Sequence, residues 1–275
     1  MTDGTQVTAT LRPVTPTSIL AGRLEQLRLD LAMVSAIDES VRADLDEICA
    51  IASGLDPYLN RCTTPSSGPL RALAEQTATH DWKNLPGGST LGLEAEMLSG
   101  HVEGQVLSFL VEMLGATTVL EVGMFTGYSA LAMAEALPID GRVLACEIDP
   151  DVAEFAQKCF ADSPDGYKID VAVGPALDTL HRLAASEEVF DLVFIDADKA
   201  SYCDYFDAVL DGGLLARGGL ICVDNTLMQG QPYLKGERTL NGVAIARFNE
   251  RVAADDRVKQ VLLPVRDGLT LIRRV

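Results

Sequence analysis

Short apolar, β-rich runs alternate with helix-periodic segments over the last two thirds of the chain. Each run is followed by a segment whose apolar residues recur at helical spacing. This pattern predicts five strands, at residues 118–122, 142–148, 168–173, 190–195 and 220–223. Helices are expected at residues 129–137, 151–161, 176–185, 201–210 and 243–252. Uninterrupted apolar runs such as residues 192–195 are typical of strands buried on both faces of a parallel sheet.

The end of the chain follows a different pattern. Two further strand-like runs, residues 258–264 and 268–273, flank the dipeptide Asp267-Gly268, which is a strong signal for a tight hairpin. Alternating strands and helices that close with a hairpin indicate an α/β fold. We therefore predict a Rossmann-like, doubly wound sheet of seven strands with a C-terminal antiparallel hairpin.

The N-terminal third lacks this alternation. Leu24, Leu27 and Leu31 have helical spacing, and helices are expected at residues 18–33 and 40–53. Turn-forming residues at 54–58 and 62–69 are expected to end the second helix. We predict a helical extension over residues 1–97, packed on the sheet or on a second subunit, and an α/β domain over residues 98–275.

Composition narrows the classes of protein. Hydrophobic residues make up 48% of the chain, but no apolar run approaches the ~20 residues that span a bilayer. The polar segment 1–12 does not resemble a signal peptide, and the six cysteines form no C-x-x-C pair, so a cytoplasmic protein is expected. The net charge of −18 disfavours nucleic acids and membranes as partners, because binding phosphates requires a basic face.

Two groups of polar and charged side chains directly follow predicted strands. Asp196, Asp198 and Lys199 come after strand 190–195, and Asp224 and Asn225 come after strand 220–223. Because open α/β sheets bind ligands at the carboxyl ends of their strands, Asp196, Asp224 and Asn225 are expected to converge. Their hard oxygen donors suit Mg²⁺ best, with Ca²⁺ or Mn²⁺ as alternatives, and do not suit zinc. The competing interpretation is that Asp198 and Asp224 only begin turns.

The turn after the first strand differs from a dinucleotide-binding loop. It reads Glu121-Val-Gly-Met-Phe-Thr-Gly127, so the middle glycine of G-x-G-x-x-G is missing. A carboxylate at residue 121 is unfavourable for a pyrophosphate and favourable for a ligand that carries positive charge. Glu147 ends the second strand, where a carboxylate accepts both hydroxyls of a ribose. An adenosine with a cationic tail describes S-adenosylmethionine.

Several short motifs occur together from about residue 98 onward. They are Glu103-Gly-Gln105, Leu120-Glu-Val-Gly-Met-Phe-Thr-Gly-Tyr-Ser129, Gly174-Pro-Ala-Leu177, Phe194-Ile-Asp-Ala-Asp-Lys199, Asp224-Asn-Thr-Leu227 and Asp267-Gly-Leu-Thr-Leu-Ile-Arg-Arg274. In these motifs the chain resembles the cation-dependent class I O-methyltransferases, the family of the caffeoyl-CoA and catechol O-methyltransferases. The segments Gly54-Leu-Asp-Pro-Tyr-Leu59 and Cys62-Thr-Thr-Pro65 are most similar to a subgroup from mycosporine biosynthesis. Members of that subgroup methylate an enolic hydroxyl of demethyl-4-deoxygadusol to give 4-deoxygadusol.

The resemblance implies roles for individual residues. It implies a homodimer, and it implies a divalent metal held by Asp196, Asp224 and Asn225, with Asp196 and Lys199 taking part in catalysis and Lys199 as the general base. The implied contacts to S-adenosylmethionine are Ser99, Glu121, Gly123, Met124, Ser129, Glu147, Ala176 and Asp196. Asp198 and Met228 correspond to positions that contact the acceptor. Plant caffeoyl-CoA enzymes have Trp at the position of Met228, and this difference disfavours a CoA thioester as the acceptor.

Other functions are compatible with parts of the pattern. The acceptor is either a small cyclic enol of the mycosporine kind or a catechol such as a caffeoyl compound. An NAD-linked oxidoreductase would use the same fold but lacks its glycine fingerprint here. A non-catalytic module that only binds S-adenosylmethionine is disfavoured, because Asp196, Lys199, Asp224 and Asn225 are all retained.

Overall fold

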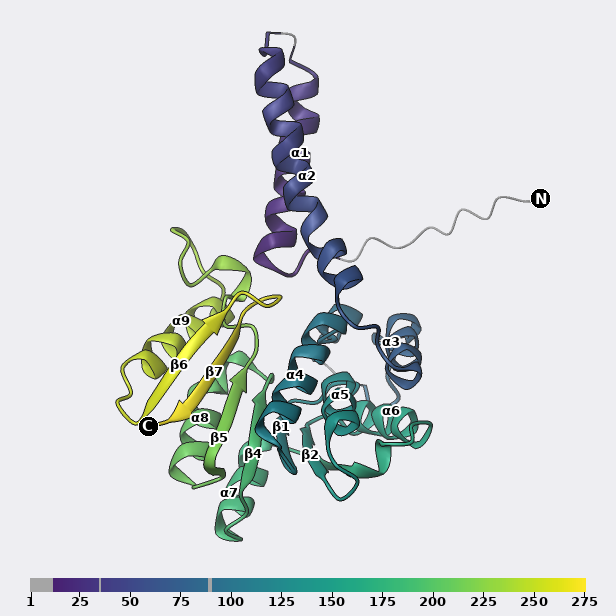
Figure 1. The fold of residues 1–275 in the computed structure, drawn as a ribbon, viewed down its shortest axis with the longest axis vertical. Helices are drawn as coiled ribbons and strands as arrows, with labels where there is room; N and C mark the ends of the chain where they lie inside the picture. Colours follow the sequence, from purple (N-terminus) through teal and green to yellow (C-terminus); the bar gives the residue numbers. More distant parts are fainter. Residues whose placement is uncertain (1–11, 35, 89–90) are drawn as a thin grey trace, which may run out of the picture.

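The protein has an α/β body built on one central sheet (Figure 1). The computed structural model describes residues 12–34, 36–88 and 91–275. The sheet has seven strands in the order β3-β2-β1-β4-β5-β7-β6. They are β1 (Thr118–Val122), β2 (Arg142–Glu147), β3 (Ile169–Val173), β4 (Phe190–Ile195), β5 (Leu215–Val223), β6 (Val258–Leu263) and β7 (Leu269–Arg274).

The direction of the strands places the ligand-binding edge of the sheet. Strands β1 to β5 pair in parallel, whereas β7 is antiparallel to both β5 and β6. The strand order reverses between β1 and β4, where sheets of this kind leave a crevice at their carboxyl ends. Val122 is paired with Ile195, so the segments that follow β1 and β4 leave the sheet side by side. The predicted doubly wound sheet with a C-terminal hairpin is confirmed.

Helices cover both faces of the sheet. The helices of the body are α3 (Gly68–Thr79), α4 (His101–Leu114), α5 (Tyr128–Ala136), α6 (Pro150–Ala161), α7 (Ala176–Ala185), α8 (Tyr202–Asp211) and α9 (Leu240–Ala253). Short 3₁₀ turns lie at η1 (Ala95–Met97), η2 (Gly166–Lys168), η3 (Lys199–Ser201) and η4 (Met228–Gly230). Helices α3 to α6 share one apolar core with the sheet, and α7 to α9 share a second core on the other face.

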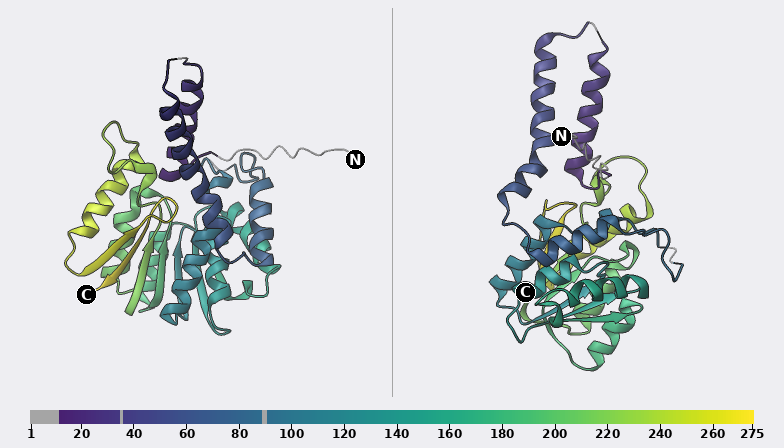
Figure 2. Two further views of the ribbon diagram at one scale, coloured as in Figure 1. Left: turned by 45° about the horizontal axis from the view of Figure 1, so that its top comes forward. Right: turned by 90° about the vertical axis from the view of Figure 1, so that its right-hand side faces the viewer.

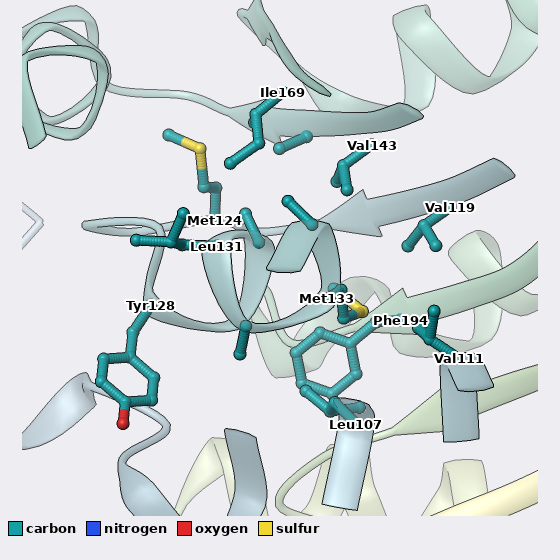
Figure 3. Close-up of a cluster of buried hydrophobic side chains, with 14 of the residues drawn as sticks. Leu107, Val111, Val119, Met124, Tyr128, Leu131, Met133, Val143, Ile169 and Phe194 are labelled. Atoms are coloured by element: carbon teal, nitrogen blue, oxygen red, sulfur yellow. The ribbon is translucent and has the colours of Figure 1, made fainter. Parts of the chain in front are cut away.

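The packing of helix α5 in the first core fixes the position of the turn that joins it to β1. Met133 of α5 packs against Leu107 of α4 and Phe194 of β4, whereas Leu131 points into the same core from another side of the helix (Figure 3). These four side chains are fully buried, so α5 is held on all sides. The turn between β1 and α5 is therefore fixed at both of its ends.

Some boundaries differ from the predicted ones. Helices α3 and α4 are not predicted by the pattern, although Leu70 and Leu73 of α3 belong to the core. Strand β5 begins at Leu215 and not at residue 220, because its pairing with β4 shifts register between Phe190 and Leu192. Gly218, with a φ of 88°, allows this irregularity in the strand. In the sequence, a glycine at this position resembles part of a turn before the strand.

The first two helices form an antiparallel hairpin that stands out from the body (Figures 1 and 2). They are α1 (Pro16–Ala32) and α2 (Glu39–Cys62). The predicted end of the second helix at residues 54–58 is wrong, since α2 continues through Pro57 to Cys62. Proline removes one helical hydrogen bond, and the carbonyl it frees, that of Ser53, belongs to an exposed residue, where water can satisfy it. Within the described ranges, no helix is both long and apolar enough to cross a membrane.

A buried lysine holds the end of α5 in place. The side chain of Lys168 is almost completely buried, and its ammonium donates to the carbonyl oxygens of Ala134 (3.0 Å) and Leu137 (2.8 Å). It also forms an ion pair with Asp165 at 2.7 Å. The last carbonyls of a helix have no partner within the helix, and Lys168 supplies one from η2, just before β3.

Replacing this lysine by an isosteric apolar residue should destabilise the fold. Lys168→Met leaves two buried carbonyls and Asp165 without their donor, so we expect a loss of about 3 kcal/mol in the free energy of unfolding. Urea denaturation followed by circular dichroism measures it. Lys158→Met is the matched control, because Lys158 pairs with Glu154 on the exposed face of α6. A Lys168→Met protein as stable as the control would contradict this role.

Candidate active site

One large cavity opens at the carboxyl ends of β1, β2, β4 and β5. Its volume is about 740 Å³. The predicted site residues in its wall are Ser99, Gly123, Met124, Ser129, Glu147, Ala176, Asp196, Asp198, Lys199, Asp224, Asn225 and Met228. The structure therefore brings together residues from six separate segments of the chain. Of the predicted site residues, Glu121 does not line the cavity, because its side chain is completely buried behind the cavity wall.

The turn after β1 depends on a glycine. Gly123 has a φ of 91°, and a Cβ atom there would lie 2.3 Å from the carbonyl oxygen of Asp196. Any other residue would push β1 and β4 apart. Because Gly123 has no side chain, the backbone of the turn lies directly against the residues that follow β4.

A buried carboxyl group lies beneath this turn. The hydroxyl of Ser129 donates to Oε1 of Glu121 at 2.5 Å, and Oε2 has no hydrogen-bond partner in the described part of the chain. Burial raises the pKa of Glu121 to about 8, and the nearby charge of Asp196 contributes. A cationic ligand above the turn would favour the ionised form of this group.

Glu147 is held rigidly at the end of β2. Its Oε2 accepts from the backbone N–H of Phe125 (2.8 Å) and its Oε1 accepts from that of Asp149 (2.9 Å). Burial raises the pKa of Glu147, and these N–H donors oppose that shift. Each carboxylate oxygen has a further lone pair, so Glu147 can also accept hydrogen bonds from a ligand in the cavity.

The two predicted carboxylate clusters meet on one side of the cavity. The ammonium of Lys199 donates to Oδ1 of Asp196 at 2.6 Å and to the hydroxyl of Tyr202 at 2.7 Å. That hydroxyl donates to the backbone carbonyl of Asp224 at 3.1 Å. Asn225, with a φ of 60°, turns its amide toward Asp224, whose Oδ2 accepts from it at 2.9 Å. Tyr202 therefore links the ends of β4 and β5.

Negative charge in this cluster is only partly compensated. Oδ1 of Asp224 is buried and has no hydrogen-bond partner among the residues that the structure describes. Burial together with the charge of Asp196 raises the pKa of Asp224 to about 7. Glu103 on α4 is completely buried, neither of its oxygens accepts a hydrogen bond from a described residue, and it forms an ion pair with Arg266 at 3.8 Å. Burial and the charge of Asp224 raise the pKa of Glu103 well above its ordinary value.

The chemistry of this donor set fits a hard divalent cation. Asp196 and Asp224 supply carboxylate oxygens, Asn225 supplies an amide, and Asp224 has an oxygen that no group of the described ranges satisfies. Across the described residues, no three His, Cys, Asp or Glu side chains form a metal-binding group by themselves. The amide of Asn225 is therefore needed to complete the set.

Three site residues were not identified from the sequence. Glu103 is on the same inward face of α4 as Leu107 and Val111, and an acid on an apolar helical stripe is a signal that was available. Tyr202 and Arg266 gave no local signal. Arg266, whose φ is 48°, reaches from the β6–β7 turn to the carbonyl oxygen of Leu98 at 2.8 Å.

Comparisons with known proteins agree with this geometry. Residues 82–275 match the protein family described as O-methyltransferase. Caffeoyl-CoA O-methyltransferase 2 of Zea mays is 40% identical over 215 residues, which cover 75% of this chain and 76% of the maize protein. The caffeoyl-CoA O-methyltransferase of Petroselinum crispum is 38% identical over 216 residues, covering 75% of this chain and 83% of the parsley protein.

Solved structures show the same fold. The SAH-bound methyltransferase PaMTH1 of Podospora anserina superposes with a TM-score of 0.70 at 28% identity, over 82% of this chain and 95% of that one. The O-methyltransferase of Bacillus cereus in complex with SAH gives a TM-score of 0.68 at 28% identity, over 81% and 97% of the two chains.

The rigid carboxylate of Glu147 leads to a prediction about cofactor binding. Glu147→Gln replaces one acceptor oxygen by an NH₂ group. That NH₂ group cannot accept a hydrogen bond from a backbone N–H or from a hydroxyl of the ligand. We expect S-adenosylmethionine to bind at least tenfold more weakly, which is about 1.4 kcal/mol by calorimetry. Glu154→Gln, on the exposed face of α6, is the control and should bind normally. Thermal unfolding without ligand checks that the turn remains folded, and an unchanged dissociation constant would remove Glu147 from the binding site.

Proposed function

This chain belongs to the O-methyltransferase family, and we propose that this S-adenosylmethionine-dependent enzyme methylates one oxygen of a vicinal pair on a small cyclic enol. The proposed acceptor is demethyl-4-deoxygadusol, which would give 4-deoxygadusol in mycosporine biosynthesis. The observation that carries the proposal is the under-compensated cluster of Glu103, Asp196 and Asp224. Asp196 and Asp224 of this cluster line the same cavity as the turn after β1, so a metal-bound acceptor and the methyl donor would be adjacent.

The strand ends of β1 and β2 would bind the donor. Glu147 would accept hydrogen bonds from the ribose hydroxyls, and the backbone at Gly123 and Met124 would form the floor beside the ribose. Ser99 and Ala176 would complete the wall. Glu121, held by Ser129 below the turn, would place negative potential near the sulfonium.

The reaction is an in-line displacement. The acceptor oxygen forms a bond to the methyl carbon while the carbon–sulfur bond breaks and its electron pair returns to sulfur. A divalent cation held by Asp196, Asp224 and Asn225 would stabilise the oxyanion of a chelating acceptor. Lys199 would accept the hydroxyl proton, from a position set by its contacts to Asp196 and Tyr202. Positioning two bound reactants accounts for the remaining acceleration.

The cavity wall supports a small acceptor without phosphates. Seven acidic and three basic side chains line the cavity within the described part of the chain. A CoA thioester carries several phosphate charges, which this wall would repel. Asp198, held by the hydroxyl of Tyr205 at 2.5 Å, and Met228 are in the part of the wall proposed for the acceptor ring.

A catechol acceptor is the second candidate. The similarity to plant caffeoyl-CoA O-methyltransferases favours it, since a catechol also offers two adjacent oxygens. The two candidates differ in acidity, because an enolic diketone is largely ionised at neutral pH and a catechol is not. That difference provides the means to separate them.

The metal proposal predicts that one substitution abolishes methyl transfer without weakening the binding of S-adenosylmethionine. Asp224→Asn should abolish methyl transfer and leave the affinity for S-adenosylmethionine within a few-fold, because Asp224 is on the acceptor side. Binding of Mn²⁺, followed by electron paramagnetic resonance, should be lost in the same variant. Asp178→Asn, on the exposed side of α7, is the control. Full activity of the wild type in excess chelator, with no Mn²⁺ bound, would overturn the metal proposal.

The acceptor proposal predicts that the two acceptors respond differently to one substitution. Lys199→Met should lower kcat for a catechol by about 10²-fold or more, because its proton must be removed. The loss with a cyclic enolic diketone should be much smaller. Wild-type kcat/KM should rank the compact enol above caffeoyl-CoA, with a simple phenol far below both. Equal losses on both acceptors would mean that Lys199 positions the site and is not its base.

A further inference from the structure

The turn between β6 and β7 carries an arginine in an unfavourable backbone conformation. Arg266 has a φ of 48°, in the left-handed region that residues with a side chain rarely adopt. Such a conformation persists only where the surrounding structure imposes it, and it is most common at functional sites. Arg266 lines the large cavity, so its side chain is a candidate for a role there.

The backbone of this turn is fastened to the segment that follows β5. The N–H of Thr226 donates to the carbonyl oxygen of Gly268 at 3.0 Å. The N–H of Leu227 donates to the carbonyl oxygen of Asp267 at 2.8 Å. A Cβ atom on Gly268 would lie 2.6 Å from the backbone nitrogen of Leu227, so only glycine allows this approach. The base of the Arg266 side chain is therefore fixed relative to the strand ends that carry the carboxylate cluster.

The guanidinium of Arg266 reaches from this turn to the segment that precedes α4. Its Nη1 donates to the carbonyl oxygen of Leu98 at 2.8 Å. Gly100, with a φ of 79°, leaves the space for the guanidinium, because a Cβ atom there would lie 2.7 Å from Nη1. One side chain therefore joins two segments that are 168 residues apart in the chain.

The segment that Arg266 contacts forms part of the cavity wall. Leu98 and Ser99 line the cavity, and neither Ser99 nor Gly100 belongs to a helix or strand. Within the described ranges, Arg266 provides the one side-chain hydrogen bond to the backbone of residues 98–100. Ser99 is only 7% exposed, so its side chain has a defined place in the wall. That place depends on the contact between Arg266 and Leu98.

A buried carboxylate compensates the charge of the guanidinium. Glu103, on the first turn of α4, is completely buried and forms an ion pair with Nε of Arg266 at 3.8 Å. Moving a guanidinium out of water is unfavourable unless a carboxylate compensates its charge. Glu103 provides that compensation, and the hydrogen bond to Leu98 sets the direction of the guanidinium. The acid on the otherwise apolar inner face of α4 therefore has a physical reason.

We propose that Arg266 is a positioning residue for S-adenosylmethionine, with Glu103 as its counter-charge. Arg266 holds Leu98 and thereby fixes Ser99, which the proposed function places against the bound cofactor. It takes no part in the methyl transfer itself. This inference rests on the cofactor site of the proposed function and on no assumption about the acceptor or the metal. The alternative is that the guanidinium only neutralises Glu103.

Arg266→Met separates these two roles when it is combined with Glu103→Gln. The single variant loses the hydrogen bond to Leu98 and leaves Glu103 without its cation. It should bind S-adenosylmethionine at least tenfold more weakly and unfold at a lower temperature. In the double variant the buried charge is gone, so the unfolding temperature should return toward that of the wild type. Its affinity should remain at least tenfold below that of the wild type, because the carbonyl of Leu98 still has no donor.

Calorimetry measures the affinity with no acceptor and no added metal, so the result is independent of both of those proposals. Arg273→Met is the matched control, because Arg273 also donates to a backbone carbonyl, that of Gly218 at 3.1 Å. Arg273 lies at the other end of β7, outside the cavity wall, and its variant should bind S-adenosylmethionine normally.

Hydrogen exchange checks the positioning directly. In the ligand-free protein, the amides of residues 99–104 should exchange faster in both Arg266 variants than in the wild type or the control. Unchanged affinity of Arg266→Met would overturn the proposal. So would a double variant that recovers wild-type affinity together with its stability, because the guanidinium would then only neutralise Glu103. A wild type that does not bind S-adenosylmethionine would overturn the cofactor site, and this inference with it.

Discussion

A close approach between two backbone segments governs the arrangement of the active site. The turn after β1 passes so near the residue after β4 that a Cβ on Gly123 would overlap the carbonyl of Asp196. This contact exists because β1 and β4 are neighbours at the point where the strand order reverses. It places the cofactor turn directly beside the carboxylate cluster. Two reactants bound on either side of that contact are held within reach of each other without any further element.

The same edge of the sheet concentrates negative charge in a buried place. Glu103, Asp196, Asp224 and Asp267 are opposed there by Lys199 and Arg266, and burial raises the pKa of Asp224 and of Asp267 to about 7. Such a cluster is unfavourable for folding, because ionised carboxylates lose hydration without full compensation. Asp196, Asp224 and Asp267 of this cluster line the large cavity, and this placement supports the proposed cation site rather than a role in stability.

The body and the α1–α2 hairpin are stabilised in different ways. The body buries α5 on all sides and ties its end with Lys168, so its structure follows from its own packing. The α1–α2 hairpin has a regular apolar repeat but only one buried side chain. Its sequence satisfies the pattern of a bundle helix, whereas its structure as a single chain satisfies only half of that pattern.

From β1 onward, the sequence by itself determined the order of strands and helices along the chain, the hairpin at Asp267-Gly268 and the two clusters after β4 and β5. Each of these follows from local chemistry, namely apolar runs, turn residues and acids at strand ends. It also indicated Gly123 and Glu147 from their places after β1 and β2. Only the tertiary structure decided that Glu103 lies beneath Asp224, since these residues are far apart in the chain and meet through helix packing. The tertiary structure also decided the path of α2 through Pro57 and the bend of β5 at Gly218. Local preference is overridden at both places, because the backbone groups that are freed can be hydrated or paired elsewhere.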